Sequence, residues 1–279
     1  MTRALRALWI ALALLLGTAA VSPPLDALGN EVEAQSRRRR ARRPSRPRRP
    51  RLTAAQRRAI RRRHRAPSRD EVRRWEAEGP PPLVLRVAGQ SASFALTPLG
   101  DAGGFEADDL LVARQAFRHR DGTEHDIHPR LLELVYRAAR HFRAPYVHLV
   151  SGVRAGSPTS RHTQGRAIDM VLPGVSDRRL AAWLRPQGFV GVGLYPTSSF
   201  VHLDVRARSY FWSDASGPDQ PNRERPMLAR QTHRYDAAAR RRGDAEPVPD
   251  LEVHTEEMEA EAETPTPADE PELDAGVGG

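Results

Sequence analysis

Residues 151–170 read SGVRAGSPTSRHTQGRAIDM, a polar loop that leads from one short apolar run into another. The run before the loop, YVHLV, and the run that closes it, AIDM, each predict a strand. Gly165 lacks a side chain and permits a tight backbone turn between His162 and Asp169. Farther along, FVHLD at residues 200–204 predicts another strand, and GVGLYP before it predicts a neighbour. The sequence therefore predicts a small group of strands that carries polar side chains.

Helices are predicted on both sides of this segment. HPRLLELVYRAARHF, residues 128–142, places apolar side chains at helical spacing and has Pro at the first helical position. SDRRLAAWLRP, residues 176–186, predicts a helix capped by Ser176. LVLRVAGQSASFALTPL, residues 83–99, alternates apolar and polar residues around a Gly-containing turn and predicts a β-hairpin. We expect these elements to form one α+β domain over residues 80–215.

The N-terminal segment has the composition of a secretory signal. Arg3 and Arg6 precede an apolar run at residues 8–16, and small residues follow at 17–20. The apolar run is shorter than the roughly 20 residues that a helix needs to span a bilayer, which favours cleavage over a permanent anchor. We therefore expect residues 1–20 to be a signal peptide and the protein to be exported to the periplasm or cell envelope.

Basic and acidic residues separate along the rest of the chain. Residues 21–79 contain the run RRRRARRPSRPRRPR, in which repulsion between guanidinium groups and frequent Pro oppose a packed core. This segment predicts a basic, disordered arm, with one short helix capped by Thr53. Residues 216–279 predict a disordered, largely acidic tail. The net charge of +9 therefore describes no single surface of the protein.

The absence of Cys narrows the chemistry that the chain can carry. It excludes a disulfide framework, a thiolate metal site and a cysteine nucleophile. His162, Asp169 and His202 offer two imidazoles and a carboxylate instead, a set suited to Zn²⁺. Three protein ligands leave one tetrahedral position open, as catalysis requires. A single His or Asp is usually exposed or hydrogen-bonded, so the joint pattern carries this prediction.

Five positions in this segment match a known signature, S-x-H-x-x-G-x-A-x-D. They are Ser160, His162, Gly165, Ala167 and Asp169. The chain thereby resembles the zinc D-alanyl-D-alanine metallopeptidases and their hedgehog-like relatives. RHRDGTEHDIHPRLLELVY, SGVR, AIDMVLPGV, GVGLYPTSSFVHLD and the trailing FW are similar to the periplasmic murein endopeptidase branch, in the same order along roughly residues 83–214.

The resemblance implies a fold and a set of site residues. The fold would be a small central antiparallel sheet with flanking helices. The zinc ligands would be His162, Asp169 and His202. Arg154 and Ser160 would contact the substrate, and the guanidinium of Arg154 would steady negative charge on the scissile carbonyl as a catalytic group.

The general base of related dipeptidases has no counterpart in this chain. Those enzymes carry Glu or Asp three residues before the last zinc-binding His, where this chain has Ser199. An alternative His-x-His arrangement is excluded because Phe200 stands two residues before His202. Strand alternation places Asp204 on the same face as His202. Asp204 could therefore be a catalytic residue that accepts the proton of the attacking water, or it could orient a metal ligand.

The sequence supports one main function and two alternatives. The main hypothesis is zinc-dependent hydrolysis of peptide bonds in peptidoglycan stem peptides or cross-links, by a murein endopeptidase or D,D-carboxypeptidase. The first alternative is a catalytically inactive, zinc-containing domain that binds the cell wall. The second is an Arg-rich nucleic-acid-binding protein, which the predicted export disfavours. Outside the cytoplasm, the basic arm would contact anionic envelope polymers or lipid head groups. The sequence makes no prediction of oligomeric state.

Overall fold

A computed structural model describes residues 52–249, apart from residues 78, 219 and 244. The predicted signal peptide, residues 21–51 of the predicted arm and residues 250–279 of the predicted tail lie outside the described residues. Within the described ranges, none of the helices combines the length and the apolar character that crossing a membrane requires.

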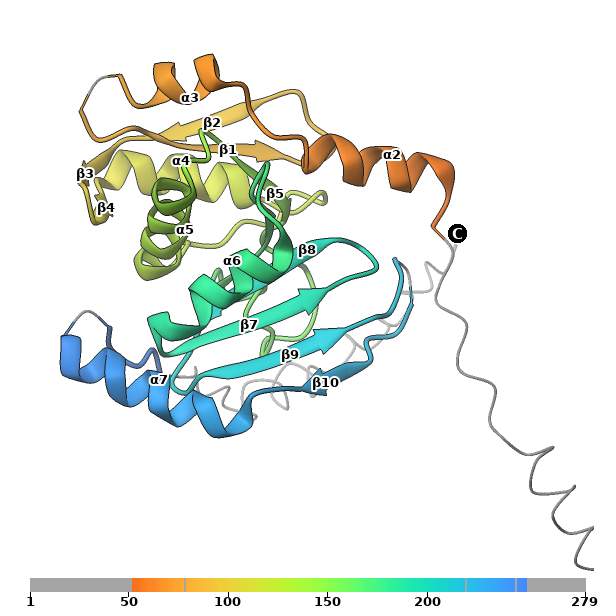
Figure 1. The fold of residues 1–279 in the computed structure, drawn as a ribbon, viewed down its shortest axis with the longest axis vertical. Helices are drawn as coiled ribbons and strands as arrows, with labels where there is room; N and C mark the ends of the chain where they lie inside the picture. The colour runs from red at the N-terminus through yellow and green to blue at the C-terminus, as the bar shows by residue number, and fades with distance from the viewer. Residues whose placement is uncertain (1–51, 78, 219, 244, 250–279) are drawn as a thin grey trace, which may run out of the picture. The chain divides into compact units, whose positions relative to one another are not determined.

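The centre of the fold is a mixed sheet of eight strands (Figure 1). The strands follow the order β10-β9-β7-β8-β6-β5-β1-β2. The pairs β1·β5 and β7·β9 are parallel, and the other neighbours are antiparallel. The strands are β1 (Leu83–Val87), β2 (Ser93–Leu96), β5 (Val147–Ser151), β6 (Ala167–Val171), β7 (Val190–Tyr195), β8 (Phe200–Val205), β9 (Tyr210–Asp214) and β10 (Glu224–Pro226). A separate two-stranded sheet contains β3 (Pro98–Gly100) and β4 (Gly103–Phe105).

Helices connect and cover these strands. They are α2 (Ala54–Arg63), α3 (Arg69–Trp75), α4 (Ala107–Phe117), α5 (Pro129–Phe142), α6 (Asp177–Leu184), the 3-10 helix η1 (Arg185–Gln187) and α7 (Ala229–Arg242). α5 and α6 contact each other and pack along β8, while α7 packs against η1 and β9 (Figure 1).

Strand alternation divides the sheet into a buried face and a face that carries polar groups. On β8, Val201, Leu203 and Val205 belong to the main hydrophobic core, which also contains the apolar side of α5. His202 and Asp204 point to the opposite face. Burial of the apolar side chains thus fixes the register of β8 and, with it, the direction of the polar ones.

The α+β class predicted from the sequence is confirmed, and so are several elements. The hairpin of β1 and β2, helix α5 and the Ser176 cap of α6 are present. The sheet is larger than expected, and it is mixed rather than antiparallel. The parallel pair β1·β5 needs a long crossover connection, which β2, β3, β4, α4 and α5 provide. Periodicity identifies strands but does not reveal which distant strands pair.

Part of the segment predicted as a disordered arm is folded. α2 has the expected Thr53 cap, and α3 follows it with a second capping box. Trp75 at the end of α3 is buried, and its Nε1 donates to the carbonyl of Pro82 at 2.8 Å. The amide of Gly174 donates to the carbonyl of His64 at 3.2 Å. Residues 52–77 are therefore folded, and the expected domain boundary at residue 80 is corrected. The sequence did not indicate this because a few specific contacts, rather than a stripe of apolar side chains, hold these helices to the domain.

The segment after residue 215 is also partly folded, where a disordered tail was expected. β10 adds an edge strand, and α7 is held by the buried carboxylate of Asp236. That carboxylate accepts hydrogen bonds from the amides of Phe189 and Ser209, at 2.7 and 3.0 Å, and from the hydroxyl of Ser209 at 2.5 Å. A single buried carboxylate does not change the composition of a segment, so the sequence did not indicate that α7 is folded.

Candidate metal centre

Three side chains from separate parts of the sequence meet on the polar face of the sheet. Asp169 on β6 and His202 on β8 are direct cross-strand partners, and His162 comes from the loop before β6. His202 Nδ1 lies 2.9 Å from Asp169 Oδ1 and 3.2 Å from His162 Nε2. His162 Nε2 lies 3.5 Å from Asp169 Oδ1. All three residues are buried, and they form the one group within the described residues that could hold a metal ion.

The hydrogen bonds of the two rings determine which nitrogen atoms carry lone pairs. His162 Nδ1 lies 2.7 Å from the carbonyl of Gly152, and His202 Nε2 lies 3.0 Å from Asp204 Oδ2. A carbonyl or carboxylate oxygen only accepts, so both of these ring nitrogens must carry hydrogen. When the rings are neutral, as metal binding requires, the lone pairs belong to His162 Nε2 and His202 Nδ1, the two atoms that face Asp169 Oδ1.

The spacing of these atoms fits a tetrahedral zinc ion. Zinc bonds of roughly 2.0–2.1 Å to nitrogen and carboxylate oxygen place neighbouring ligand atoms about 3.3 Å apart. The observed separations of 2.9, 3.2 and 3.5 Å bracket that value. His162, Asp169 and His202 therefore fit the metal that the chemistry of the donor set indicates.

The electrostatics of the cluster also favour a bound cation. Burial of the His202 ring opposes its charged form, but Asp169 and Asp204 outweigh this effect and raise the pKa of His202 to about 9. Burial likewise opposes ionisation of Asp169, yet His162 and His202 hold the pKa of that carboxyl well below its usual range. The ionised carboxylate of Asp169 thus favours a positive charge at the point between the two rings.

Asp204 is surrounded by hydrogen-bond donors on the far side of His202. Arg206 Nε donates to Asp204 Oδ1 at 2.6 Å, and Arg206 Nη2 donates to Asp204 Oδ2. Arg161 Nε lies 3.5 Å from Asp204 Oδ1. Although Asp204 is buried, His202 and Arg206 lower its pKa well below the usual range. A carboxylate in this setting accepts hydrogen bonds well but takes up a proton poorly.

Arg154 and Ser160 both line a cleft of about 340 Å³ beside the metal-ligand cluster. Arg154 Nη2 donates to Asp169 Oδ2, and Arg154 Nε donates to the hydroxyl of Ser151 at 2.9 Å. The Arg154 side chain is 45% exposed, so part of its guanidinium faces the cleft. The structure thus brings together all six site residues named from the sequence, since His162, His202 and Asp204 line the same cleft and Asp169 lies beneath Arg154.

The cleft also contains residues that sequence reasoning did not assign to a site. Trp212 packs against His202 with their ring centroids 5.1 Å apart, and its Nε1 donates to the hydroxyl of Tyr195 at 3.2 Å. A side chain at Gly193 would collide with the Trp212 ring, so the ring can lie flat over β7 only because position 193 is Gly. Glu224 lines the far rim and belongs to the segment that was expected to be tail. The FW pair at residues 211–212 was a usable signal, but nothing in the sequence connected Glu224 to the cleft.

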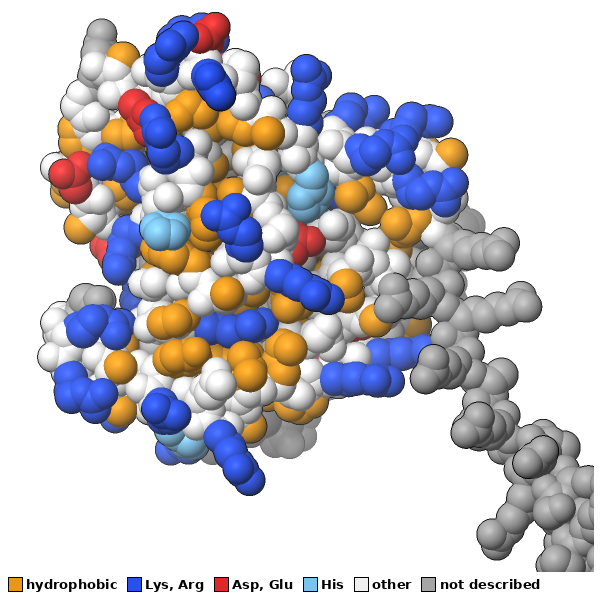
Figure 2. Space-filling model, viewed as in Figure 1, with side chains coloured by type: hydrophobic (Ala, Val, Ile, Leu, Met, Phe, Trp, Pro, Cys, Tyr) orange, Lys and Arg blue, Asp and Glu red, His pale blue; other side chains and the backbone are white. Residues whose placement is uncertain are grey.

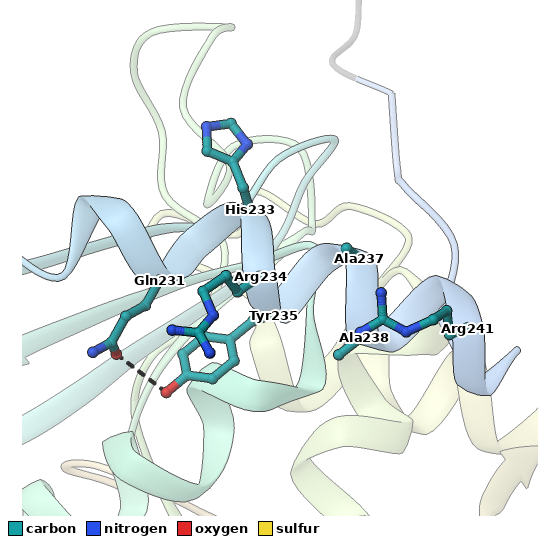
Figure 3. A pocket seen from close by; sticks show the side chains of 7 residues that line it. All are labelled: Gln231, His233, Arg234, Tyr235, Ala237, Ala238 and Arg241. Carbon is teal, nitrogen blue, oxygen red and sulfur yellow. Dashed lines mark hydrogen bonds between the residues drawn. The ribbon is translucent and has the colours of Figure 1, made fainter.

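A larger cavity, about 590 Å³, lies along α7 and has different chemistry. Figure 3 shows that its lining side chains come from one helix, where the hydroxyl of Tyr235 donates to Gln231 Oε1 at 3.2 Å. Its described lining contains Arg and His but no carboxylate, and none of the predicted site residues. We therefore assign the chemistry to the cleft beside His162, despite its smaller volume.

Comparison with known proteins agrees with this geometry. Residues 105–204 match the family model described as peptidase M15. The chain is 32% identical over 123 residues to the peptidoglycan L,D-endopeptidase MepK of Escherichia coli strain K12, and equally to those of Escherichia coli O157:H7 and Shigella flexneri. The match covers 38% of this chain and 66% of each relative, slightly less than two thirds of their length. No solved structure shows a significant match. The matched residues contain the whole metal-ligand cluster, so the similarity to the peptidase M15 family includes the candidate metal centre.

Proposed function

We propose that this protein is an exported zinc peptidase that hydrolyses peptide bonds in peptidoglycan stem peptides or cross-links. The observation that carries the proposal is the convergence of His162 Nε2, Asp169 Oδ1 and His202 Nδ1 at separations of 2.9–3.5 Å. The peptidase family and the relatives named as peptidoglycan L,D-endopeptidases support both the reaction and the substrate. The periplasm or cell envelope, where that substrate lies, agrees with the signal expected at residues 1–20.

In this proposal His162, Asp169 and His202 hold the zinc ion. Zinc bound there would polarise the scissile carbonyl and activate the attacking water. The protein's own contribution is orientation, because the carbonyl of Gly152 fixes the ring of His162 and Asp204 fixes the ring of His202. Metal-binding imidazoles that donate their second N–H in this way are held in one tautomer and one orientation.

The surroundings of Asp204 favour one of the two roles that the sequence left open. Arg206 occupies both of its oxygens, and His202 shares one of them. This pairing stabilises the ionised carboxylate and makes it a weak proton acceptor. We therefore propose Asp204 as a positioning residue for His202 rather than as the general base.

Arg154 and Ser160 are proposed to contact the substrate at the open side of the cleft. The half-exposed guanidinium of Arg154 is held in place by Asp169 and Ser151, so it is preorganised toward the metal-ligand cluster. A fixed cation in this position stabilises negative charge that develops on the scissile carbonyl. Tyr195 and Trp212 add an apolar wall, and burial raises the pKa of Tyr195 to about 12, so its hydroxyl keeps its proton.

The decisive experiment is digestion of intact sacculi with the purified full-length chain. We expect released muropeptides whose masses identify a cut peptide bond, and we expect a chelator or the His162→Ala substitution to abolish their release. Metal analysis should find one zinc ion in the wild type and none in His162→Ala. A chain that holds zinc and binds sacculi but releases no fragments would refute the peptidase and support the alternative of an inactive wall-binding domain.

The basic arm at residues 21–79 is proposed to contact anionic envelope polymers or lipid head groups rather than nucleic acid. In its described part, Arg57, Arg58 and Arg61 on α2 are exposed. Contacts of this kind are screened over about 10 Å at 0.1 M salt, so retention on sacculi should weaken steeply as salt rises. Salt-independent retention would contradict this role.

A further inference from the structure

A third cavity, of about 370 Å³, lies between α2 and the hairpin of β1 and β2. Its lining includes Arg62 and Arg63 from α2, Arg86 from β1 and His148 from β5. Arg86 and His148 are direct neighbours in the parallel pair of strands. This cavity shares no lining residue with the metal-centre cleft, so its chemistry can be tested separately.

The register of the sheet places both cavities on the same face. His148 on β5 pairs with Val171 on β6, and Val171 is two residues from Asp169. Side chains two positions apart on a strand point the same way, as do direct cross-strand partners. The Arg-lined cavity therefore opens on the face of the sheet that carries the metal-ligand cluster. It lies toward the end of the sheet formed by β1 and β2, whereas the cluster lies on β6 and β8.

The cavity collects positive charge without a matching anion among its described lining residues. The Arg63 Nε atom is buried and has no hydrogen-bond partner. The guanidinium of Arg86 lies 3.4 Å above the Tyr146 ring, which holds it in place without neutralising it. The carboxylate of Asp177, whose charge acts on Arg63, lies outside the lining and accepts from the hydroxyl of Ser199 at 3.0 Å.

The behaviour of His148 reflects the same excess of positive charge. Its pKa is lowered to about 4, first by burial and then by the charges of Arg86, Arg63 and His64. At neutral pH the ring is therefore uncharged and keeps one N–H that can donate. Figure 2 shows basic side chains gathered over α2 at the edge of this region.

We propose that this cavity is a binding site for a phosphate-type oxyanion. Guanidinium groups present paired N–H donors whose spacing matches phosphate oxygens, and three of them converge here from two elements. Ser93 and Gln90 at the hairpin add neutral polar groups to the lining. The bound anion would supply the acceptor that Arg63 Nε lacks. This inference does not depend on the peptidase activity proposed above.

The test is a titration of the full-length chain with inorganic phosphate at constant ionic strength, followed by calorimetry and by the NMR signal of His148. We expect saturable binding that shifts the His148 signal. Arg63→Gln and Arg86→Gln should each weaken binding about tenfold or more, because each removes charge-assisted hydrogen bonds. Arg61→Gln is the matched control, since it removes the same charge from the opposite side of α2 and should change binding less than about twofold.

Two sources of the phosphate group can be separated with vesicles of phosphatidylglycerol. Vesicle binding that falls further in Arg63→Gln than in Arg61→Gln, which removes only an exposed charge of the basic arm, would identify a lipid head group as the ligand. If Arg61→Gln and Arg63→Gln bind vesicles equally while Arg63→Gln alone binds inorganic phosphate more weakly, the ligand is a free or polymer-borne phosphate. If Arg61→Gln and Arg63→Gln weaken phosphate binding equally, or the His148 signal does not respond, the site does not exist. Melting curves of both Arg63→Gln and Arg86→Gln distinguish lost binding from lost folding.

Discussion

Asp169 and Asp204 show how two identical side chains beside one imidazole can have different surroundings. Each lies against one nitrogen of His202, and each is bound by its own arginine, Arg154 or Arg206. The difference is position, because Asp169 Oδ1 faces His162 whereas Asp204 lies on the far side of the ring. The signature in the sequence was sufficient to identify the three metal-ligand candidates. It could not decide the role of Asp204, because that depends on the arginine which neutralises it.

A signal for this pairing was nevertheless present in the sequence. Arg206 stands two residues after Asp204, as Asp204 stands two residues after His202. The alternation that placed Asp204 beside His202 also places Arg206 beside Asp204. The pattern His-x-Asp-x-Arg at the end of a strand thus indicates a chain of hydrogen bonds that leads to the ring, here with Arg206 as the residue that directly follows β8.

Asp204→Asn should weaken metal binding more than it impairs the chemical step. Loss of a carboxylate that supports a metal-binding imidazole typically costs 10- to 100-fold in metal affinity. We therefore expect the zinc affinity of the variant, measured by competition with a chelating dye, to fall by about that factor. Turnover of a soluble muropeptide should return to near the wild-type rate when excess zinc is added.

The opposite result would restore Asp204 as the general base. In that case the variant would hold zinc with wild-type affinity, and turnover would stay about a hundredfold or more below wild type at every zinc concentration. Arg206→Gln serves as a companion variant. It should lower zinc affinity in the same direction, because it removes the partner that keeps Asp204 ionised and in place.

Among the elements, α7 shows how a helix of weak apolar character is fixed to the sheet. Its buried residues include only one apolar side chain, Ala239, together with Thr232 and Asp236. Arginines make up much of the rest of its sequence. The helix depends on Asp236, which receives hydrogen bonds from the start of β7 and from the loop before β9. Hydrophobic periodicity could not predict this helix, since the decisive interaction is polar and distant in sequence.

Asp236→Ala should destabilise the protein by about 2–4 kcal/mol, because two buried amides and one hydroxyl lose their acceptor. The free energy of unfolding can be measured by urea titration with tryptophan fluorescence. Arg241→Ala, an exposed change on the same helix, should cost less than about 0.5 kcal/mol. Equal effects of the two substitutions would show that other contacts hold α7.

Strand β5 gives the fold a dependence on pH through His148. The folded-state pKa of about 4 lies below the value near 6.5 that the residue has in an unfolded chain. As pH falls below 6.5, the unfolded chain therefore takes up the proton first, and stability is lost between pH 6.5 and 4. Because the ring is only half-buried, we expect about 1 kcal/mol of this loss to come from His148.

The comparison that isolates this contribution uses His148→Gln. The free energy of unfolding of the wild type relative to the variant should decrease by about 1 kcal/mol between pH 7 and pH 4.5. Above pH 7 the difference should be constant, since the ring is neutral in both the folded and the unfolded chain. A difference that stays unchanged across this range would show that His148 titrates normally in the folded protein.

For the whole molecule, the sequence predicted the class, the main helices and the metal-ligand candidates, but not the extent of the folded part. Local periodicity was strong in α5 and in the core strands, which bury their apolar side chains. At both ends the fold continues through a few specific contacts, among them those of Trp75 on one side and Asp236 on the other. These contacts join residues that are far apart in the sequence. The arginine-rich composition of both segments therefore predicted disorder where the chain is folded.

A chain that begins at residue 80 should be less stable than one that begins at residue 52. The shorter chain loses the burial of Trp75, its hydrogen bond to Pro82 and the ion pair between Glu76 and Arg143. Loss of the buried indole alone is worth about 2–3 kcal/mol, and we expect a melting temperature about 5–10 °C lower. The longer chain with Trp75→Ala should lie between the two. Equal melting temperatures would mean that α2 and α3 rest on the domain without stabilising it.

The parallel pairing of β1 with β5 has a consequence for the order in which the chain folds. β7 and β8 are joined by the short turn at residues 196–199 and can pair soon after synthesis, whereas Leu85 must find Val147 across the intervening helices. The partners Asp169 and His202 belong to the early, antiparallel group of strands. We therefore expect the metal-ligand candidates to come together in a partly folded chain in which β1 has not yet paired with β5. In the mature protein β2 is the edge strand at this end of the sheet, and it should be among the first parts to exchange its amide hydrogens with solvent.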